Sequence, residues 1–296
     1  MITRKFTPGT EWLYIKIYSS KYYIDHILTH EISSIIKKLE KDKIISKFFF
    51  IRYEDPHYHL RLRFLTSELK NLSLILEMLC IKLKKYIKNE IVWKIQIDTY
   101  EREIERYNKY LINITETLFY IDSKYVIEAL KKISEDEKEN YKWMLAIKSI
   151  DSYLNLFETD ISKKLLIIKS MSNSFKLEFS FNDNNSKILN NMYREKRHIF
   201  EDILFNSEKS EDALFIHLSK IIKKRDKELL PVVFEIKNIC KNKKLNYINY
   251  LGSYIHMNIN RIIPSKNRIH ELLLYDFIKR CYESEIARKN INYEKN

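Results

Sequence analysis

Hydrophobic residues in the first hundred positions alternate between strand-like and helix-like spacing. A period of two predicts a strand with one buried face, and recurrence at every third or fourth residue predicts a helix. By these criteria the expected elements are a strand at 12–18, a helix at 24–39, strands at 48–53 and 58–65 around the turn Glu54-Asp55-Pro56-His57, a helix at 67–88 and a strand at 91–98. The order β-α-β-β-α-β predicts a ferredoxin-like antiparallel sheet, with two helices on one face and the other face left for a partner or another subdomain.

Beyond residue 100 the spacing becomes helical over long lysine-rich stretches. Breaks are expected near 172–185 and at Pro231 and Pro264, where helix-breaking residues occur. The segment Tyr100–Tyr107 is expected to open a helix. The second half of this α+β chain is therefore predicted to be mainly helical.

The chain is expected to form one domain over residues 1–296, with a sheet-bearing half at 1–99 and a helical half at 100–296. No repeat period or linker rich in proline, glycine or serine divides it. No segment approaches the ~20 apolar residues that cross a bilayer. The start lacks the apolar run of a signal peptide, so we expect a cytoplasmic protein.

Composition narrows the functional classes. A net charge of +13 favours an acidic partner, but the lysines are scattered and no nucleic-acid motif accompanies them, so we expect no direct nucleic-acid binding. Only two glycines occur in the chain. Phosphate-binding loops of the P-loop and dinucleotide types need several glycines close together, which argues against ATP- or NAD-dependent chemistry, and no cofactor is expected.

The strand at 58–65 carries the most informative polar pattern. Because side chains alternate across a strand, His57, His59, Arg61 and Arg63 share one face. Arginine forks match carboxylate geometry, so this face is expected to meet an acidic ligand. His57 and His59 have the spacing of a strand-borne metal chelate, but no third ligand is evident, and no metal site is expected.

Two other segments contain candidate functional groups. Helical spacing sets Arg106 beside both Arg102 and Glu103. Runs of charged residues usually form a solvated face. This run follows a sheet strand, however, so its charges could converge with Arg61 and Arg63. Near the C-terminus, His256 lies in an apolar helical stretch. Its ordinary pKa near 6.5 suits proton transfer, and a structural role is the alternative.

Several motifs together resemble the C-terminal domain of lantibiotic dehydratases, which also occurs alone as the thiopeptide-type bacteriocin biosynthesis protein. The segments that carry the resemblance are Trp12-Leu13-Tyr14-Ile15-Lys16, Phe49-Phe50-Ile51-Arg52-Tyr53, Asp55-Pro56, His59-Leu60-Arg61-Leu62-Arg63, Tyr100-Glu101-Arg102-Glu103-Ile104-Glu105-Arg106-Tyr107, His256-Met257 with Asn260-Arg261, and the tail 268–282. The chain departs from the family at Asn108-Lys109, where glycines are more usual.

The resemblance implies a glutamate elimination reaction in a split system. A separate tRNA-dependent protein would esterify Ser or Thr of a ribosomal precursor peptide with glutamate, and this chain would remove the glutamate to leave dehydroalanine or dehydrobutyrine. The implied catalytic residues are Arg63 and Arg106, which hold the glutamyl group and developing charge, His256, which transfers a proton, and Glu103, which orients Arg106 or shares proton transfer. The implied substrate-binding residues are Arg52, His59, Arg61, Arg102 and Arg261.

Two alternatives stay open. Pyridine synthases of thiopeptide pathways share this scaffold and join two dehydroalanines by a formal [4+2] cycloaddition. A non-catalytic module that adds a precursor peptide to a sheet edge is the other. Whether His256 acts as base or acid, and whether the chain forms a homo-oligomer, also stay open.

Overall fold

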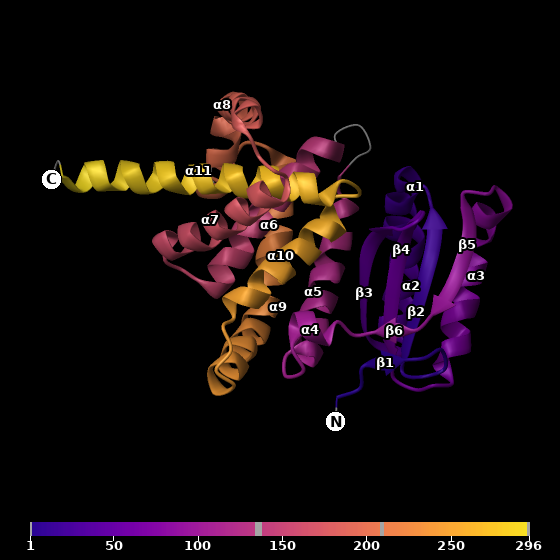
Figure 1. Cartoon of the computed structure of the whole chain (residues 1–296). Helices are drawn as coiled ribbons and strands as arrows, with labels where there is room; N and C mark the ends of the chain where they lie inside the picture. The colour runs from indigo at the N-terminus through magenta and orange to yellow at the C-terminus, as the bar shows by residue number, and fades with distance from the viewer. Residues whose placement is uncertain (1, 134–137, 208–209, 295–296) are drawn as a thin grey trace. The chain divides into compact units, whose positions relative to one another are not determined.

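The computed structural model of the chain describes residues 2–133, 138–207 and 210–294 (Figure 1). Its architecture is α+β, with an N-terminal antiparallel four-stranded sheet followed by a mainly helical half. The chain divides into two compact units, the first formed by Met1–Lys132 and Phe234–Leu245 and the second by Ile133–Val233 and Asn246–Asn296. The long helix α9 therefore contributes to both units.

The main sheet has the strand order β3-β4-β2-β5, and every neighbouring pair is antiparallel. Its strands are β2 (Trp12–Ser19), β3 (Ile45–Glu54), β4 (Tyr58–Thr66) and β5 (Val92–Asp98). The helical segments between the strands are α1 (Lys21–His26), η1 (Ile27–Ile32), α2 (Ser33–Lys41) and α3 (Asn71–Lys88). The succession β-α-β-β-α-β expected from hydrophobic spacing is the one observed, with the expected 24–39 helix subdivided by the π-helical η1.

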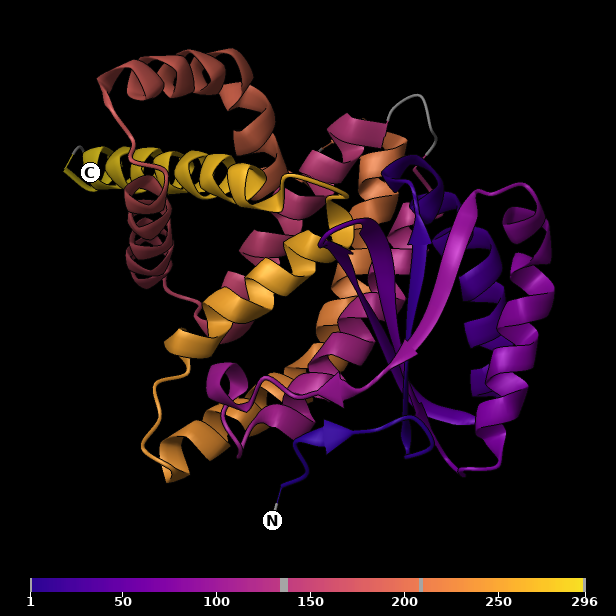
Figure 2. The same cartoon turned by 45° about the vertical axis from the view of Figure 1, so that its right-hand side comes forward.

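The register separates an apolar face of the sheet from a polar one. Tyr14 pairs with Arg63 and Lys16 with Arg61, so these four side chains share one face. On the other face the side chains of Ile15, Ile17, Leu60 and Leu62 are fully buried. Helices α2 and α3 lie on the same side of the sheet (Figure 2). The hydrophobic alternation of β2 and β4 thus decides which face the helices cover.

The segment that follows β5 is not the single helix expected from its charge spacing. Tyr100 and Glu101 form a short strand, β6 (Tyr100–Glu101), which pairs with β1 (Lys5–Phe6), and the helical turn α4 (Ile104–Tyr107) starts only after Glu103. Pairing with β1 holds Tyr100 and Glu101 extended, which overrides the local helical spacing.

Helix α5 (Ile112–Leu130) covers the outer edge of β3. Lys47 Nζ donates a hydrogen bond to Thr117 Oγ1 (2.7 Å), and the Phe50 backbone N–H donates to Ser123 Oγ (3.3 Å). The opposite edge of the sheet is β5, on which Trp93 is 50% exposed. Of the two sheet edges, β5 is therefore the one open to an added strand.

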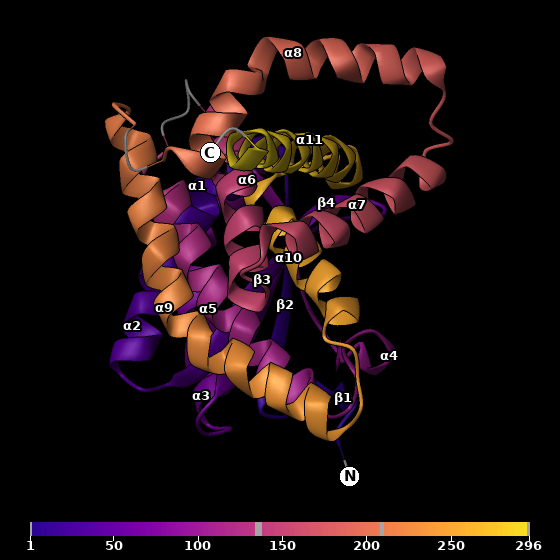
Figure 3. The same ribbon diagram turned by 90° about the vertical axis from the view of Figure 1, so that its left-hand side faces the viewer.

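The second unit is built from helices (Figure 3). They are α6 (Lys138–Phe157), α7 (Ile161–Glu178), α8 (Asp183–Phe205), part of α9 (Ala213–Asn242), α10 (Ile248–Ile262) and α11 (Asn267–Glu294). Helix α11 packs on α7 and α8, and α10 packs on α6. No helix among the residues described is long and apolar enough to span a membrane.

Two of the three expected helix breaks are observed, and one is wrong. Pro264 follows the end of α10, and the break near 172–185 is the short gap between α7 and α8. Pro231, in contrast, lies inside α9. A proline inside a helix costs ~3 kcal/mol. Burial of Leu229, Val233 and Ile236 on either side of it offsets that cost.

Candidate functional site

Arg63 lies within β4 with its guanidinium enclosed by aromatic rings. Its Cζ is 4.5 Å from the ring centre of Tyr14, 4.8 Å from that of Tyr100 and 5.1 Å from that of Phe49. The residue is 7% exposed, and its Nε and Nη1 have no hydrogen-bond partner among the described residues. Burial lowers the pKa of Arg63 from its very high ordinary value. A buried guanidinium without a carboxylate is costly, so Arg63 is well suited to receive one from a ligand.

Trp12, Tyr14 and Arg63 are buried, so a later segment of the chain covers this end of the face that was expected to be left for a partner or another subdomain. The reason is local: the Tyr100 ring of β6 packs edge-on against Trp12 and Phe49 (centroids 5.4 and 6.0 Å apart) and so covers this end of the face.

Arg61 lies two residues before Arg63 on the same strand face. Its Cζ is 3.4 Å from the ring centre of Tyr53, and its Nε donates to His59 Nε2 at 3.0 Å. His59 Nδ1 in turn lies 2.7 Å from the His57 carbonyl oxygen. These contacts require a neutral imidazole with the proton on Nδ1. Burial, together with the charge of Arg61, lowers the pKa of His59 and favours that neutral form.

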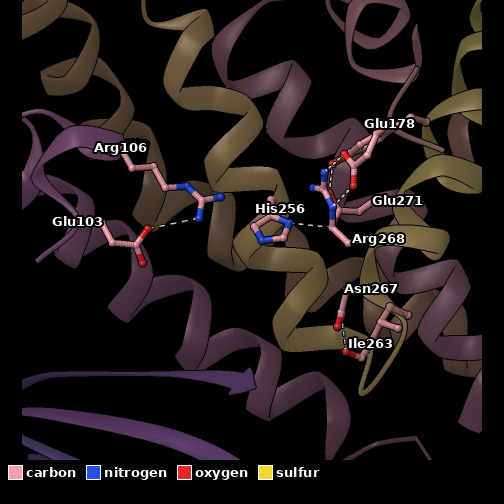
Figure 4. Close-up of polar contacts among 9 residues, drawn as sticks. Glu103, Arg106, Glu178, His256, Ile263, Asn267, Arg268 and Glu271 are labelled. Carbon is pink, nitrogen blue, oxygen red and sulfur yellow. Dashed lines mark hydrogen bonds and ion pairs between the residues drawn. The ribbon is translucent and has the colours of Figure 1, made fainter. Parts of the chain in front are cut away.

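Glu103 and Arg106 form an ion pair beside this face. The Arg106 Nη1 to Glu103 Oε2 distance is 3.4 Å, and the two side chains are 35% and 59% exposed (Figure 4). The negative charge of Glu103 raises the pKa of Arg63 and so opposes the effect of burial, whereas the positive charge of Arg61 lowers that pKa. Glu103 therefore lies close enough to Arg63 to affect its charge, and it pairs directly with Arg106.

Arg102, expected at the same site, forms an ion pair with a buried carboxylate of the chain itself, that of Glu116. Its Nε donates to Glu116 Oε1 at 2.7 Å and its Nη2 to Glu116 Oε2 at 2.6 Å, while Nη1 donates to the Thr3 carbonyl oxygen. Glu116 is 3% exposed and also accepts a hydrogen bond from the Tyr100 hydroxyl at 2.8 Å. The bidentate pair gives Arg102 an architectural role.

Arg52 lies on the opposite, helix-covered face of the sheet. It pairs across the ladder with Leu60, whose side chain is fully buried there. The Arg52 Nη2 atom is 2.5 Å from Asp25 Oδ1, an acid from α1, and both residues are buried. The alternation of β3 thus separates Arg52 from Arg61 and Arg63, and this placement favours a structural role.

In the second unit, His256 of α10 pairs with a buried acid of α11. His256 Nδ1 lies 2.7 Å from Glu271 Oε1, and the Glu271 side chain is 1% exposed against 23% for His256. Tyr275, one turn further along α11, donates to Glu271 Oε2 at 3.1 Å. With the proton of Nδ1 held by Glu271, Nε2 is the nitrogen available for proton transfer.

Arg268 places a positive charge on the other side of this acid. Its Nη1 is 3.8 Å from Glu271 Oε2, its Nε donates to Glu178 at 3.1 Å, and its Cζ lies 4.0 Å from the ring centre of Phe175. Asn267 donates to the Ile263 carbonyl oxygen at 2.7 Å and so closes the turn between α10 and α11 (Figure 4). Arg261 lies on α10 and is fully buried.

The structure thus places seven of the expected residues in the first unit, namely Arg52, His59, Arg61, Arg63, Arg102, Glu103 and Arg106, and the other two, His256 and Arg261, in the second. Sequence reasoning missed Glu116 and Glu271. Glu116 has the apolar residues Ile112 and Phe119 at helical spacing, and this pattern was a signal in the sequence that the acid faces the core. For Glu271, the helical spacing of Arg268, Glu271 and Tyr275 was the available clue. Among the described residues, no group of three or more His, Cys, Asp or Glu side chains is placed to hold a metal ion.

Comparison with known proteins identifies the relatives of this chain. The family model for the lantibiotic biosynthesis dehydratase C-terminus matches residues 12–282. The nisin biosynthesis protein NisB of Lactococcus lactis subsp. lactis is 29% identical over 287 residues, which cover 95% of this chain and 26% of NisB. The chain spans about a quarter of the length of the curated relatives that it matches.

Two solved structures have the same fold. The tRNA-dependent lantibiotic dehydratase MibB from Microbispora sp. 107891 matches with a TM-score of 0.75 and 17% identity, over 98% of this chain and 29% of MibB. TbtD, the pyridine synthase from thiomuracin biosynthesis, matches with a TM-score of 0.72 and 10% identity, over 93% of this chain and 98% of TbtD. At these identities the likeness concerns the fold alone.

Proposed function

Because the chain belongs to the lantibiotic biosynthesis dehydratase C-terminal family, we propose that it eliminates glutamate from glutamylated Ser or Thr residues of a ribosomal precursor peptide. The observation that carries this proposal is the buried guanidinium of Arg63, whose Nε and Nη1 have no hydrogen-bond partner among the described residues. A glutamyl group supplies the carboxylate that such a site lacks.

The proposed reaction breaks a C–H and a C–O bond and forms an N–H and a π bond. His256 Nε2 accepts the α-proton of the glutamylated residue, which leaves an enolate-like charge on Cα and the adjacent amide carbonyl. That electron pair then forms the Cα=Cβ double bond as the Cβ–O ester bond breaks. Glutamate departs as a carboxylate with the electrons of the broken bond. Glu271 holds Nδ1 and stabilises the imidazolium that forms, which supports the base role for His256.

The arginines supply positive charge where negative charge develops. Arg63 and Arg106 bind the glutamyl group and stabilise the enolate-like intermediate and the departing carboxylate, and Glu103 orients Arg106. Arg61, held by Tyr53 and His59, adds to the positive potential of the same sheet face.

The partners proposed for this reaction are a glutamylated precursor peptide and a separate tRNA-dependent glutamylating protein. The second candidate function is the [4+2] pyridine synthase reaction, which the fold-level match to TbtD over nearly all of both chains favours. Its product is a macrocycle, so the two candidates are distinguished by mass.

Purified protein incubated with a precursor peptide already glutamylated on Ser or Thr, without added ATP or metal, is expected to release glutamate. The peptide product is one water lighter than the unmodified peptide, and mass spectrometry detects both products. Unchanged glutamyl peptide after long incubation with folded protein would sink the elimination proposal. A macrocycle with expulsion of a leader fragment would establish the pyridine synthase reaction instead.

Substitutions test the assigned roles in the same assay. His256→Ala and Arg63→Ala are each expected to slow glutamate release by ~100-fold to ~10,000-fold, the usual contribution of a positioned proton-transfer group or charge-stabilising donor. His198→Ala and Arg194→Ala, at exposed positions of α8, are the matched controls and should retain activity. Wild-type rates in both site variants would refute the residue assignment.

A further inference from the structure

Tyr100 stands between Arg63 and a buried acid. Its ring centre is 4.8 Å from the Arg63 Cζ, and its hydroxyl donates to Glu116 Oε1 at 2.8 Å. Burial and the charge of Glu116 raise the pKa of Tyr100 well above its ordinary value, so the phenol keeps its proton and remains a donor. A phenol that donates to a carboxylate has a more electron-rich ring, which strengthens its attraction for a guanidinium.

Arg102 occupies the carboxylate that Arg63 would otherwise attract. Both Glu116 oxygens accept hydrogen bonds from Arg102, at 2.7 and 2.6 Å, and the Arg102 Cζ lies 4.8 Å from the ring centre of Phe6. The Phe6 ring in turn stacks on Tyr100 with centroids 5.9 Å apart. The pair of Glu116 and Arg102 is neutral as a whole, so it anchors Tyr100 without neutralising Arg63.

We propose that Glu116 is a positioning residue that holds the Tyr100 ring against the Arg63 guanidinium, while Arg102 keeps the Glu116 carboxylate from pairing with Arg63 itself. Among the described residues, the rings of Tyr14, Phe49 and Tyr100 surround the Arg63 guanidinium, which thereby stays available for the carboxylate of a ligand. This inference rests on the proposed function in one respect, the assignment of Arg63 as a carboxylate-binding group.

The test compares two tyrosine hydroxyls that each donate to a glutamate. Tyr100→Phe keeps the ring and removes its hydrogen bond to Glu116. Tyr86→Phe on α3 is the matched control, because the Tyr86 hydroxyl donates to Glu31 Oε1 at 3.1 Å on the helix-covered side of the sheet. The probe is N-acetyl-L-glutamate, and its binding is followed through the NMR resonance of the Arg63 Nε–H group. That resonance is assigned as the one that disappears in the Arg63→Lys variant.

Tyr100→Phe is expected to shift the Arg63 Nε–H resonance and to weaken N-acetyl-L-glutamate binding roughly tenfold, a typical effect of a lost hydrogen bond to a charged group. Tyr86→Phe should leave both unchanged, whatever it does to the thermal midpoint. Three results would each overturn the inference. The first is an unshifted Arg63 resonance with wild-type affinity in Tyr100→Phe, and the second is an equal loss of probe affinity in both variants. The third is a wild-type Arg63 resonance that does not respond to the probe. If the wild-type protein binds the probe as expected but releases no glutamate from the glutamylated peptide, the inference is supported and the elimination proposal is refuted.

Discussion

At the residue scale, two arginines of one hairpin differ in their surroundings. Arg52 faces the helices and contacts Asp25 at 2.5 Å, whereas Arg63 faces the other way and contacts aromatic rings. Burial by itself would lower the pKa of Arg52, but the Asp25 carboxylate outweighs that effect and raises it. The buried ion pair indicates that Arg52 supports the fold, while Arg63 is the arginine for which we propose a ligand-binding role.

Arg52→Ala is therefore expected to lower the free energy of unfolding by ~3–5 kcal/mol, because it leaves the buried Asp25 carboxylate without its partner. Arg63→Ala should cost less, since no carboxylate loses a partner there. Urea unfolding followed by circular dichroism measures both. The double variant Arg52→Met with Asp25→Leu removes both charges and should recover most of the loss. An Arg52→Ala variant as stable as the wild type would contradict this structural role.

At the element scale, the turn between α4 and α5 has an unusual backbone. Asn108 has φ +65° and ψ 145° at the end of α4. Its side-chain oxygen accepts a hydrogen bond from the Tyr110 backbone N–H at 3.0 Å. This combination of φ and ψ lies outside the left-handed helical region that asparagine tolerates, and the added hydrogen bond offsets part of the resulting strain. The turn that follows Arg106 is thus formed without glycine.

Asn108→Ala is expected to destabilise the protein by ~1–3 kcal/mol, because alanine meets the same strained backbone and lacks the side-chain acceptor. Asn108→Gly removes the strain and the acceptor together, so its stability should lie close to that of the wild type. Thermal unfolding ranks the variants, with Lys109→Ala at the exposed neighbouring position as the control. If alanine and glycine at position 108 gave equal midpoints, positive φ would not be the limiting feature of this turn.

At the scale of the whole molecule, the net charge of +13 raises the question of a nucleic-acid partner. In the first unit several basic groups are already paired, including Arg52 with Asp25, Arg102 with Glu116 and Lys16 with Asp98. Such pairs reduce the charge available to a phosphate backbone. The surface is therefore expected to attract acidic partners weakly and without sequence preference.

We expect glutamyl-tRNA to bind this chain only weakly, with a complex that disappears at modest salt. Binding through several phosphates would make the affinity fall steeply with salt concentration while remaining strong at low salt. A gel-shift titration at near-physiological salt measures this, with the glutamylated precursor peptide assayed in parallel. Tight, saturable binding of the tRNA to this chain alone would disprove the expectation.

Several features of the protein were determined by the sequence itself. Strand alternation already assigns Arg61 and Arg63 to one face and Leu60 and Leu62 to the other, and helical spacing already brings Glu103 next to Arg106. These relations depend on neighbours within four residues, whose geometry the backbone dictates. The succession of strands and helices in the sheet follows from the same local periods.

Only the tertiary structure decided what surrounds those residues. Tyr100 and Glu116 are 37 and 53 positions from Arg63, and Glu271 meets His256 only because the chain turns back after Pro264. Pairing of β6 with β1 overrode the helical spacing at Tyr100 and Glu101, and burial of its apolar neighbours kept α9 helical through Pro231. Such contacts depend on the free energy of packing between distant segments, which local spacing does not encode.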